Sequence, residues 1–121
     1  MSNYTKHLLA QSLSGEAINI SATGINTTLI HTTLSSSSVM DEVWVYASNS
    51  TDADLTFKLL YGGTHFSNSI LFNGVIEAYA GSILICPGFI ARGNDTIGFS
   101  IYGNSSSLSG INVFGYVNRI S

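Results

Sequence analysis

Short segments in which apolar and polar residues alternate follow one another along most of this chain. A period of two places successive side chains on opposite faces of a β-strand, and no window has the sustained period of an amphipathic helix. Clusters of Gly, Asn and Ser separate the segments, which is typical of turns. The strands predicted in this way cover residues 17–22, 27–34, 41–49, 53–61, 69–72, 75–80, 82–86, 96–102 and 110–121.

Two of the predicted breaks depend on residues with special backbone preferences. Asn73-Gly74 stands between two apolar runs and favours a hairpin, although a bulge inside one longer strand has the same sequence signature. Pro87 has no N–H to donate to a sheet and is therefore expected to end the strand 82–86.

About eight short strands in one domain of 121 residues predict an all-β fold, an antiparallel β-sandwich of jelly-roll or Greek-key type. An eight-stranded barrel is the alternative. We assign residues 17–121 to the sandwich, because the pattern of residues 1–16 is less regular. That segment forms either a first edge strand or an N-terminal arm. An arm with Leu8, Leu9 and Leu13 could add a strand to the sheet of a neighbouring subunit.

The segments 41–49 and 110–121 are apolar on both faces. Aliphatic residues such as Val43 and Val113 occupy one face, and aromatic residues occupy the other. The aromatic residues are Trp44, Tyr46, Phe114 and Tyr116. The second face is either covered within the chain, as in a barrel, or forms a subunit interface, where Trp and Tyr are enriched. With only 9% charged residues to resist contact, we predict that these four aromatic residues form an interface between copies of the chain, in a dimer or a trimer.

The scattered charges and the short apolar runs argue against nucleic acid and membrane as partners. The net charge is −3, and the four cationic residues, Lys6, Lys58, Arg92 and Arg119, are too scattered to form a basic patch for nucleic acid. No apolar run approaches the roughly 18 residues that cross a bilayer, and "LLA" near the start is too short for the core of a signal peptide. We therefore expect neither a nucleic-acid nor a membrane partner.

The candidates for catalysis are few. His7, His31 and His65 do not have the spacing of metal ligands. His31 lies within a strand, on the same face as Leu29, and we expect it to be a strand histidine hydrogen-bonded at an interface rather than a catalytic residue. Cys86 in the apolar "ILICP" is expected to be a buried, inert thiol.

The carboxylates give no clear site either. Asp52 and Asp54 form a D-x-D that could hold calcium, but the glycine and the distal glutamate of a calcium loop are missing. Glu77 lies among apolar residues and is either solvent-facing at an edge or paired with an arginine across an interface. We expect no enzyme activity, no metal and no cofactor.

Four segments resemble small virion structural proteins of tailed bacteriophages. They are "DEVWVYASNS", the "YGGT" turn, "ILICPG" and the terminal "VFGYVNRI". In such proteins an "EVW-YASN" strand, a "GGT" turn, a "VVPG"-like strand end and a closing "GYVNRI" recur in that order. The resemblance spans roughly residues 20–120. These motifs are structural, so no catalytic or binding residue is carried over.

The resemblance implies a capsid decoration or cement protein with a β-sandwich fold. Such a protein is made in the host cytoplasm and lies on the capsid surface of the virion. Its partners are further copies of itself and the major capsid protein, and weak contacts suffice because many copies act together on a lattice. The alternative is a tail-fibre, appendage or receptor-binding module, in which Trp44 and the tyrosines stack on glycan rings.

Overall fold

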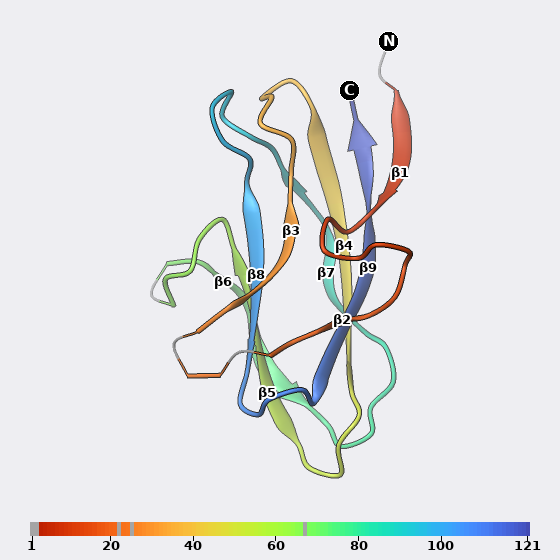
Figure 1. Cartoon of the computed structure of the whole chain (residues 1–121), viewed down its shortest axis with the longest axis vertical. Helices are drawn as coiled ribbons and strands as arrows, with labels where there is room; N and C mark the ends of the chain where they lie inside the picture. Colours follow the sequence, from red (N-terminus) through yellow and green to blue (C-terminus); the bar gives the residue numbers. More distant parts are fainter. Residues whose placement is uncertain (1–2, 22, 25, 67) are drawn as a thin grey trace.

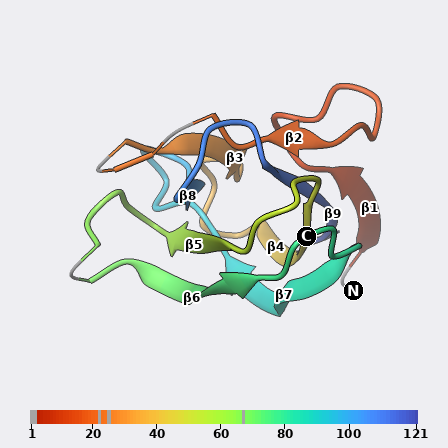
Figure 2. The same ribbon diagram turned by 90° about the horizontal axis from the view of Figure 1, so that it is seen from below.

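The computed structural model describes residues 3–21, 23–24, 26–66 and 68–121, and they form two packed β-sheets (Figure 1). The strands are β1 (Tyr4–Leu8), β2 (Ile18–Asn19), β3 (Thr28–Thr32), β4 (Met40–Asn49), β5 (Leu55–Tyr61), β6 (Ile70–Ile76), β7 (Ile83–Ala91), β8 (Ser100–Ser105) and β9 (Ile111–Ile120). The first sheet has five strands in the order β1-β9-β4-β7, with β2 also pairing with β9. The second has the order β3-β8-β5-β6. Figure 2 shows the two layers from below.

The strand pairing identifies the sandwich as a jelly roll. Strands β5 and β6 pair, and outward from them the pairs are β4 with β7, β3 with β8, and β2 with β9, all antiparallel. This nesting is that of one long hairpin wound into two sheets. The predicted fold class is therefore confirmed. The barrel alternative is wrong, because no pairing joins the two sheets among the described residues.

The core lies between the sheets and follows from the alternation. In β4 every second residue is buried, and Val43, Val45 and Ala47 have no exposed surface. Phe57 and Leu59 of β5 face them from the other sheet and are also fully buried. Each large apolar side chain buried in this way contributes about 1.5–3 kcal/mol to folding.

Residues 4–8 form an edge strand of the chain's own sheet. β1 pairs with the second half of β9, from Tyr4 opposite Ile120 to Leu8 opposite Tyr116. Leu9 then turns into the core with 1% of its surface exposed. The short β2 follows along the first half of β9, with Ile18 and Ile20 buried. The predicted strand 17–22 is thus shorter, and its residue Ala22 lies outside the described residues.

Asn73 and Gly74 do not form a hairpin. They lie inside β6, opposite Lys58 and Phe57, and the register shift of this strand pair lies elsewhere, between Leu59 and Leu60. Gly74 suits the position because a Cβ there would stand 2.9 Å from the ring of Phe72. The predicted strand 75–80 is likewise wrong, since β6 ends at Ile76 and a turn follows.

Pro87 does not end its strand. β7 continues through it to Ala91, because β7 is an edge strand whose outer side needs no N–H donor. The ladder with β4 is shifted at this point, between Val43 and Trp44. Gly88 takes up the bulge with a φ of 81°, a left-handed conformation that favours glycine.

The predicted strand 96–102 is displaced along the chain. The side chain of Asn94 accepts hydrogen bonds from the N–H groups of Thr96 and Ile97, which holds that stretch as a loop. β8 begins at Ser100 and runs to Ser105, into a stretch predicted to be a turn.

The β4–β9 ladder requires glycine at one position. A Cβ on Gly115 would lie 2.1 Å from the backbone oxygen of Trp44 in the neighbouring strand, so Gly115→Ala must push the two strands apart. We expect this variant to lose about 2 kcal/mol or more of the free energy of unfolding, measured by chemical denaturation. Gly81→Ala is the matched control, because nothing lies within 4 Å of a Cβ there. Equal stabilities of the two variants would contradict the expectation.

Candidate functional site: the outer face of the five-stranded sheet

The four aromatic residues singled out in the sequence lie together on the outer face of the five-stranded sheet. Trp44 of β4 stands opposite Tyr116 of β9, and Tyr46 stands opposite Phe114. Residues directly opposite each other in an antiparallel pair point to the same side of the sheet. All four remain partly or fully exposed, whereas their neighbours in sequence, such as Val45, are buried.

Hydrogen bonds and ring contacts hold these side chains in place. The rings of Trp44 and Tyr116 are stacked, with centroids 6.3 Å apart and planes 14° apart. Trp44 Nε1 and Asn118 Nδ2 both donate to Glu42 Oε1, over 2.8 and 3.0 Å. These bonds, with that from Asn118 the larger cause, lower the pKa of Glu42 below its usual value. Lys6 Nζ lies 4.8 Å from the centroid of the Tyr116 ring, a cation–π contact.

The bulge in β7 makes room for the tryptophan. A Cβ on Gly88 would lie 2.8 Å from Cζ2 of Trp44, so the indole packs directly against the glycine backbone. The sequence held a signal for this contact, the pair Pro87-Gly88 within an otherwise apolar segment, but it was read as the end of a strand.

The apolar outer face is wider than the four aromatic residues. Further large exposed side chains extend it to both edges of the sheet. They are Leu84 and Ile90 of β7, and Tyr4 and Leu8 of β1. Sequence reasoning missed the β7 residues because two register shifts against β4 break the alternation there. The β1 residues were missed because the sequence does not indicate which strand residues 4–8 pair with, and therefore which face Tyr4 and Leu8 occupy.

A buried ionic cluster joins the two sheets at another place. His31 Nε2 lies 2.8 Å from Asp41 Oδ2, and Arg119 donates from Nε and Nη2 to the two oxygens of Asp41, over 2.8 and 3.1 Å. His31 comes from β3, and the other two come from β4 and β9. The two hydrogen-bonded groups lower the pKa of Asp41 from 3.8 to about 2, against the opposing effect of burial.

The cluster does not have the arrangement of a catalytic dyad. The backbone N–H of Ala10 donates to His31 Nδ1 over 2.9 Å, so Nε2 carries the proton and donates to Asp41. Both ring nitrogens are therefore engaged, and neither can accept a proton from a nucleophile. The expectation that His31 is a hydrogen-bonded strand residue is confirmed. The bulge between Leu29 and His31, however, puts them on opposite faces, so the expected shared face is wrong.

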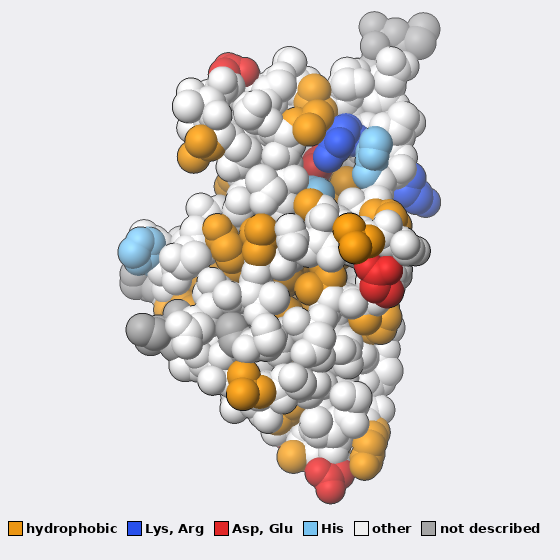
Figure 3. Space-filling model, in the orientation of Figure 1, with side chains coloured by type: hydrophobic (Ala, Val, Ile, Leu, Met, Phe, Trp, Pro, Cys, Tyr) orange, Lys and Arg blue, Asp and Glu red, His pale blue; other side chains and the backbone are white. Residues whose placement is uncertain are grey.

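Two members of the cluster, His31 and Arg119, line an open groove of about 590 Å3 between β1 and β3. Lys6, His7 and Leu34 line it as well. Figure 3 shows basic and histidine side chains gathered over this end of the molecule, with few charged side chains elsewhere on the same side. No carboxylate is among the residues that line the groove, and the hydroxyl of Ser12, which does line it, donates to the carbonyl of Glu16 over 2.8 Å.

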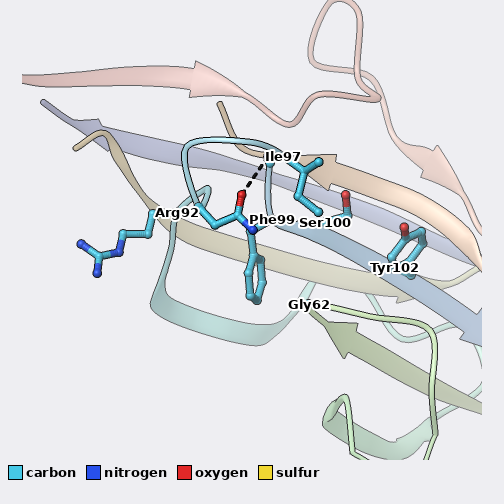
Figure 4. Close-up of a pocket in the computed structure, with 8 residues that line it drawn as sticks. Gly62, Arg92, Ile97, Phe99, Ser100 and Tyr102 are labelled. Atoms are coloured by element: carbon cyan, nitrogen blue, oxygen red, sulfur yellow. Dashed lines mark hydrogen bonds between the residues drawn. The ribbon is translucent and has the colours of Figure 1, made fainter. Parts of the chain in front are cut away.

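A second hollow of about 310 Å3 lies beside the loop before β8 (Figure 4). Phe99 and Tyr102 contribute rings to it, and Figure 4 shows Arg92 extending away from them. Arg92 Nη1 instead donates to the Ser37 carbonyl over 3.3 Å. The side-chain oxygen of Asn94 accepts hydrogen bonds within the loop, and the hydroxyl of Ser100 is hydrogen-bonded to that of Thr32 over 3.1 Å.

The remaining sequence candidates lie apart from one another. Cys86 is fully buried, as predicted, and burial raises the pKa of its thiol. His65 and Glu77 are exposed in separate loops of the chain. Asp54 accepts the N–H of Ala78 and closes a turn. The described residues contain no group of three or more His, Cys, Asp or Glu side chains that could hold a metal.

Comparisons with protein-family models, with curated proteins and with solved structures found no match to this chain. The described part of the chain has no helix long and apolar enough to cross a membrane.

The ionic cluster predicts a specific response to acid. Because the pKa of Asp41 is lowered on folding, its contribution to stability is complete above about pH 4 and is lost as the pH falls towards 2. We expect a loss of roughly 2 kcal/mol at most from this group, measured by denaturant unfolding across that range.

The variant Asp41→Asn isolates this effect. It should be less stable by about 3 kcal/mol at pH 7, because Arg119 and His31 lose their charged partner. Its deficit relative to the unsubstituted protein should then shrink between pH 4 and pH 2. Asp52→Asn, at an exposed turn position, should keep the original acid response. A constant deficit for Asp41→Asn over this range would contradict the assignment.

Proposed function

We propose that this chain is a non-enzymatic structural protein of a phage virion, a decoration or cement protein that self-associates and bridges neighbouring capsid subunits. The observation that carries the proposal is the outer face of the five-stranded sheet. Aromatic and aliphatic side chains cover it from β7 to β1, and its charged residues among those described are Lys6 and Glu42. A surface of this kind, left in water, favours association with another apolar surface.

The rest of the molecule suits a structural role. The ring nitrogens of His31 beside the groove are both hydrogen-bonded, and in the second hollow Arg92, Asn94 and Ser100 bond to neighbouring parts of the chain. The jelly roll is held by ladders of up to ten residue pairs, such as that between β4 and β9. A rigid protein with one apolar binding surface can stabilise a lattice through many weak contacts, because detachment of the array requires all of these contacts to break.

The occupant of the outer face is proposed to be a second copy of the chain. The face carries one positive and one negative side chain, so it is electrically neutral and can meet itself without net repulsion. The second surface of the protein, the outer side of the β3-β8-β5-β6 sheet or the loops, is then free for the major capsid protein.

Two substitutions test the self-association. Trp44→Ser and Phe114→Ser each remove a ring from the centre of the outer face, and each should raise the dissociation constant at least about 30-fold, the effect of removing a hot-spot side chain. Sedimentation equilibrium measures this. Val75→Ser, an exposed position on β6 of the other sheet, is the control and should associate normally. Association of all three variants like the unsubstituted chain would overturn the proposal.

The copy number of the chain in purified virions tests the decoration role. We expect a large lattice fraction, near one copy per major capsid subunit, by quantitative mass spectrometry against that protein. About a dozen copies would instead favour the appendage or receptor-binding alternative, in which Trp44 and the tyrosines meet glycans. Absence from virions would reject both.

A further inference from the structure

Two side chains of opposite charge flank one residue symmetrically on the outer face. Lys6 of β1 and Glu42 of β4 both lie directly opposite Asn118 of β9, one on each side of it. Adjacent strands are about 4.8 Å apart, so the two positions are separated by roughly 10 Å with β9 midway. The other Lys, Arg, Asp and Glu side chains on the described strands of this sheet, Asp41 and Arg119, bond to each other on the inner side.

The adjacent rows of the sheet have the same symmetry. In each, a central β9 residue is flanked by one apolar or aromatic residue on either side. One row consists of Leu8, Tyr116 and Trp44. The other consists of Tyr4, Ile120 and Met40. Across β9, apolar positions therefore correspond to apolar positions, and the positive position corresponds to the negative one.

We infer that two copies pack these faces together about a two-fold axis running along β9, so that Lys6 of each copy meets Glu42 of the other. The inference rests on the proposed self-association and specifies its geometry. A rotation about this axis exchanges the two sides of β9 and keeps each row in place. Packed sheets lie about 10 Å apart, a distance that an extended Lys and a Glu can span together.

Other two-fold arrangements bring like charges together. An axis along β4 places Glu42 on Glu42, and an axis along β1 places Lys6 on Lys6. An axis across the strands through Asn118 does both. Charges buried beside a like charge or without a partner are costly, so these arrangements are disfavoured relative to the axis along β9.

The two charged groups are already oriented for this contact. Both hydrogen bonds that Glu42 accepts from described residues go to Oε1, which leaves Oε2 for a donor from another copy. The ammonium of Lys6 is held beside the Tyr116 ring, close to the proposed axis. Little side-chain freedom is then lost on association.

Charge reversal tests the geometry. Lys6→Glu and Glu42→Lys should each weaken self-association at least tenfold, because each places like charges in contact in both halves of the symmetric interface. The double variant should restore association to within about threefold of the unsubstituted chain. An equimolar mixture of the two single variants should form a mixed dimer. Sedimentation velocity and native mass spectrometry measure these results.

Two further variants keep the test decisive. Lys58→Glu makes the same charge change on β5 of the other sheet and should leave association unchanged. If Glu42→Lys does not fold, Lys6→Glu is compared with Lys6→Glu combined with Glu42→Gln. The combination removes the like charge and should associate at least threefold more tightly than Lys6→Glu alone.

The outcomes separate this inference from the proposed function. An unsubstituted chain that associates while the reversals have no effect, or while the double variant fails to recover, would overturn the axis along β9 and leave self-association standing. A chain that stays monomeric at all concentrations would overturn both.

Discussion

The pairing of β4 with β9 is the contact on which the rest of this structure depends. Ten residue pairs run without a shift from Met40 opposite Ile120 to Asn49 opposite Ile111. The inner side of this ladder supplies the valines of the core, and its outer side supplies the aromatic face. Gly115 permits the close approach of the two backbones. This one pair of strands thus supplies one side of the core, two of the three residues of the ion cluster and the centre of the outer face.

The sequence predicted the two strands of this ladder and their faces, but not their pairing, and it predicted the edge strands less well. Regular alternation in 41–49 and 110–121 was enough to assign the valines to one face and the aromatic residues to the other. Successive side chains of a strand point to opposite faces, so no other assignment fits this alternation. The errors fall where one residue interrupts that period. The bulge beside His31, the shifts in β7 and the glycine inside β6 each depend on a tertiary contact rather than on local preference.

The ion cluster was beyond the reach of pattern reasoning for a different reason. Asp41 lies 10 positions after His31 and Arg119 lies 78 positions after Asp41, and no spacing rule connects them. Only the jelly-roll winding brings β3, β4 and β9 to one end of the sandwich. Through the N–H of Ala10, the buried cluster also holds the N-terminal segment just after β1 ends at Leu8. Lys6, one of the two charged residues of the outer face, lies on β1 itself.

The bulged edge at Pro87 and Gly88 has a consequence for how such molecules accumulate. An open sheet edge can template the addition of further strands without limit, and a proline with a bulge blocks that route on β7. When two sandwiches pack their outer faces together about a two-fold axis, each face is covered by the other. No such face is then left for a third copy. In the arrangement that we propose, growth from this edge into filaments would be suppressed, and many copies would stay as finite particles at high concentration until a surface recruits them.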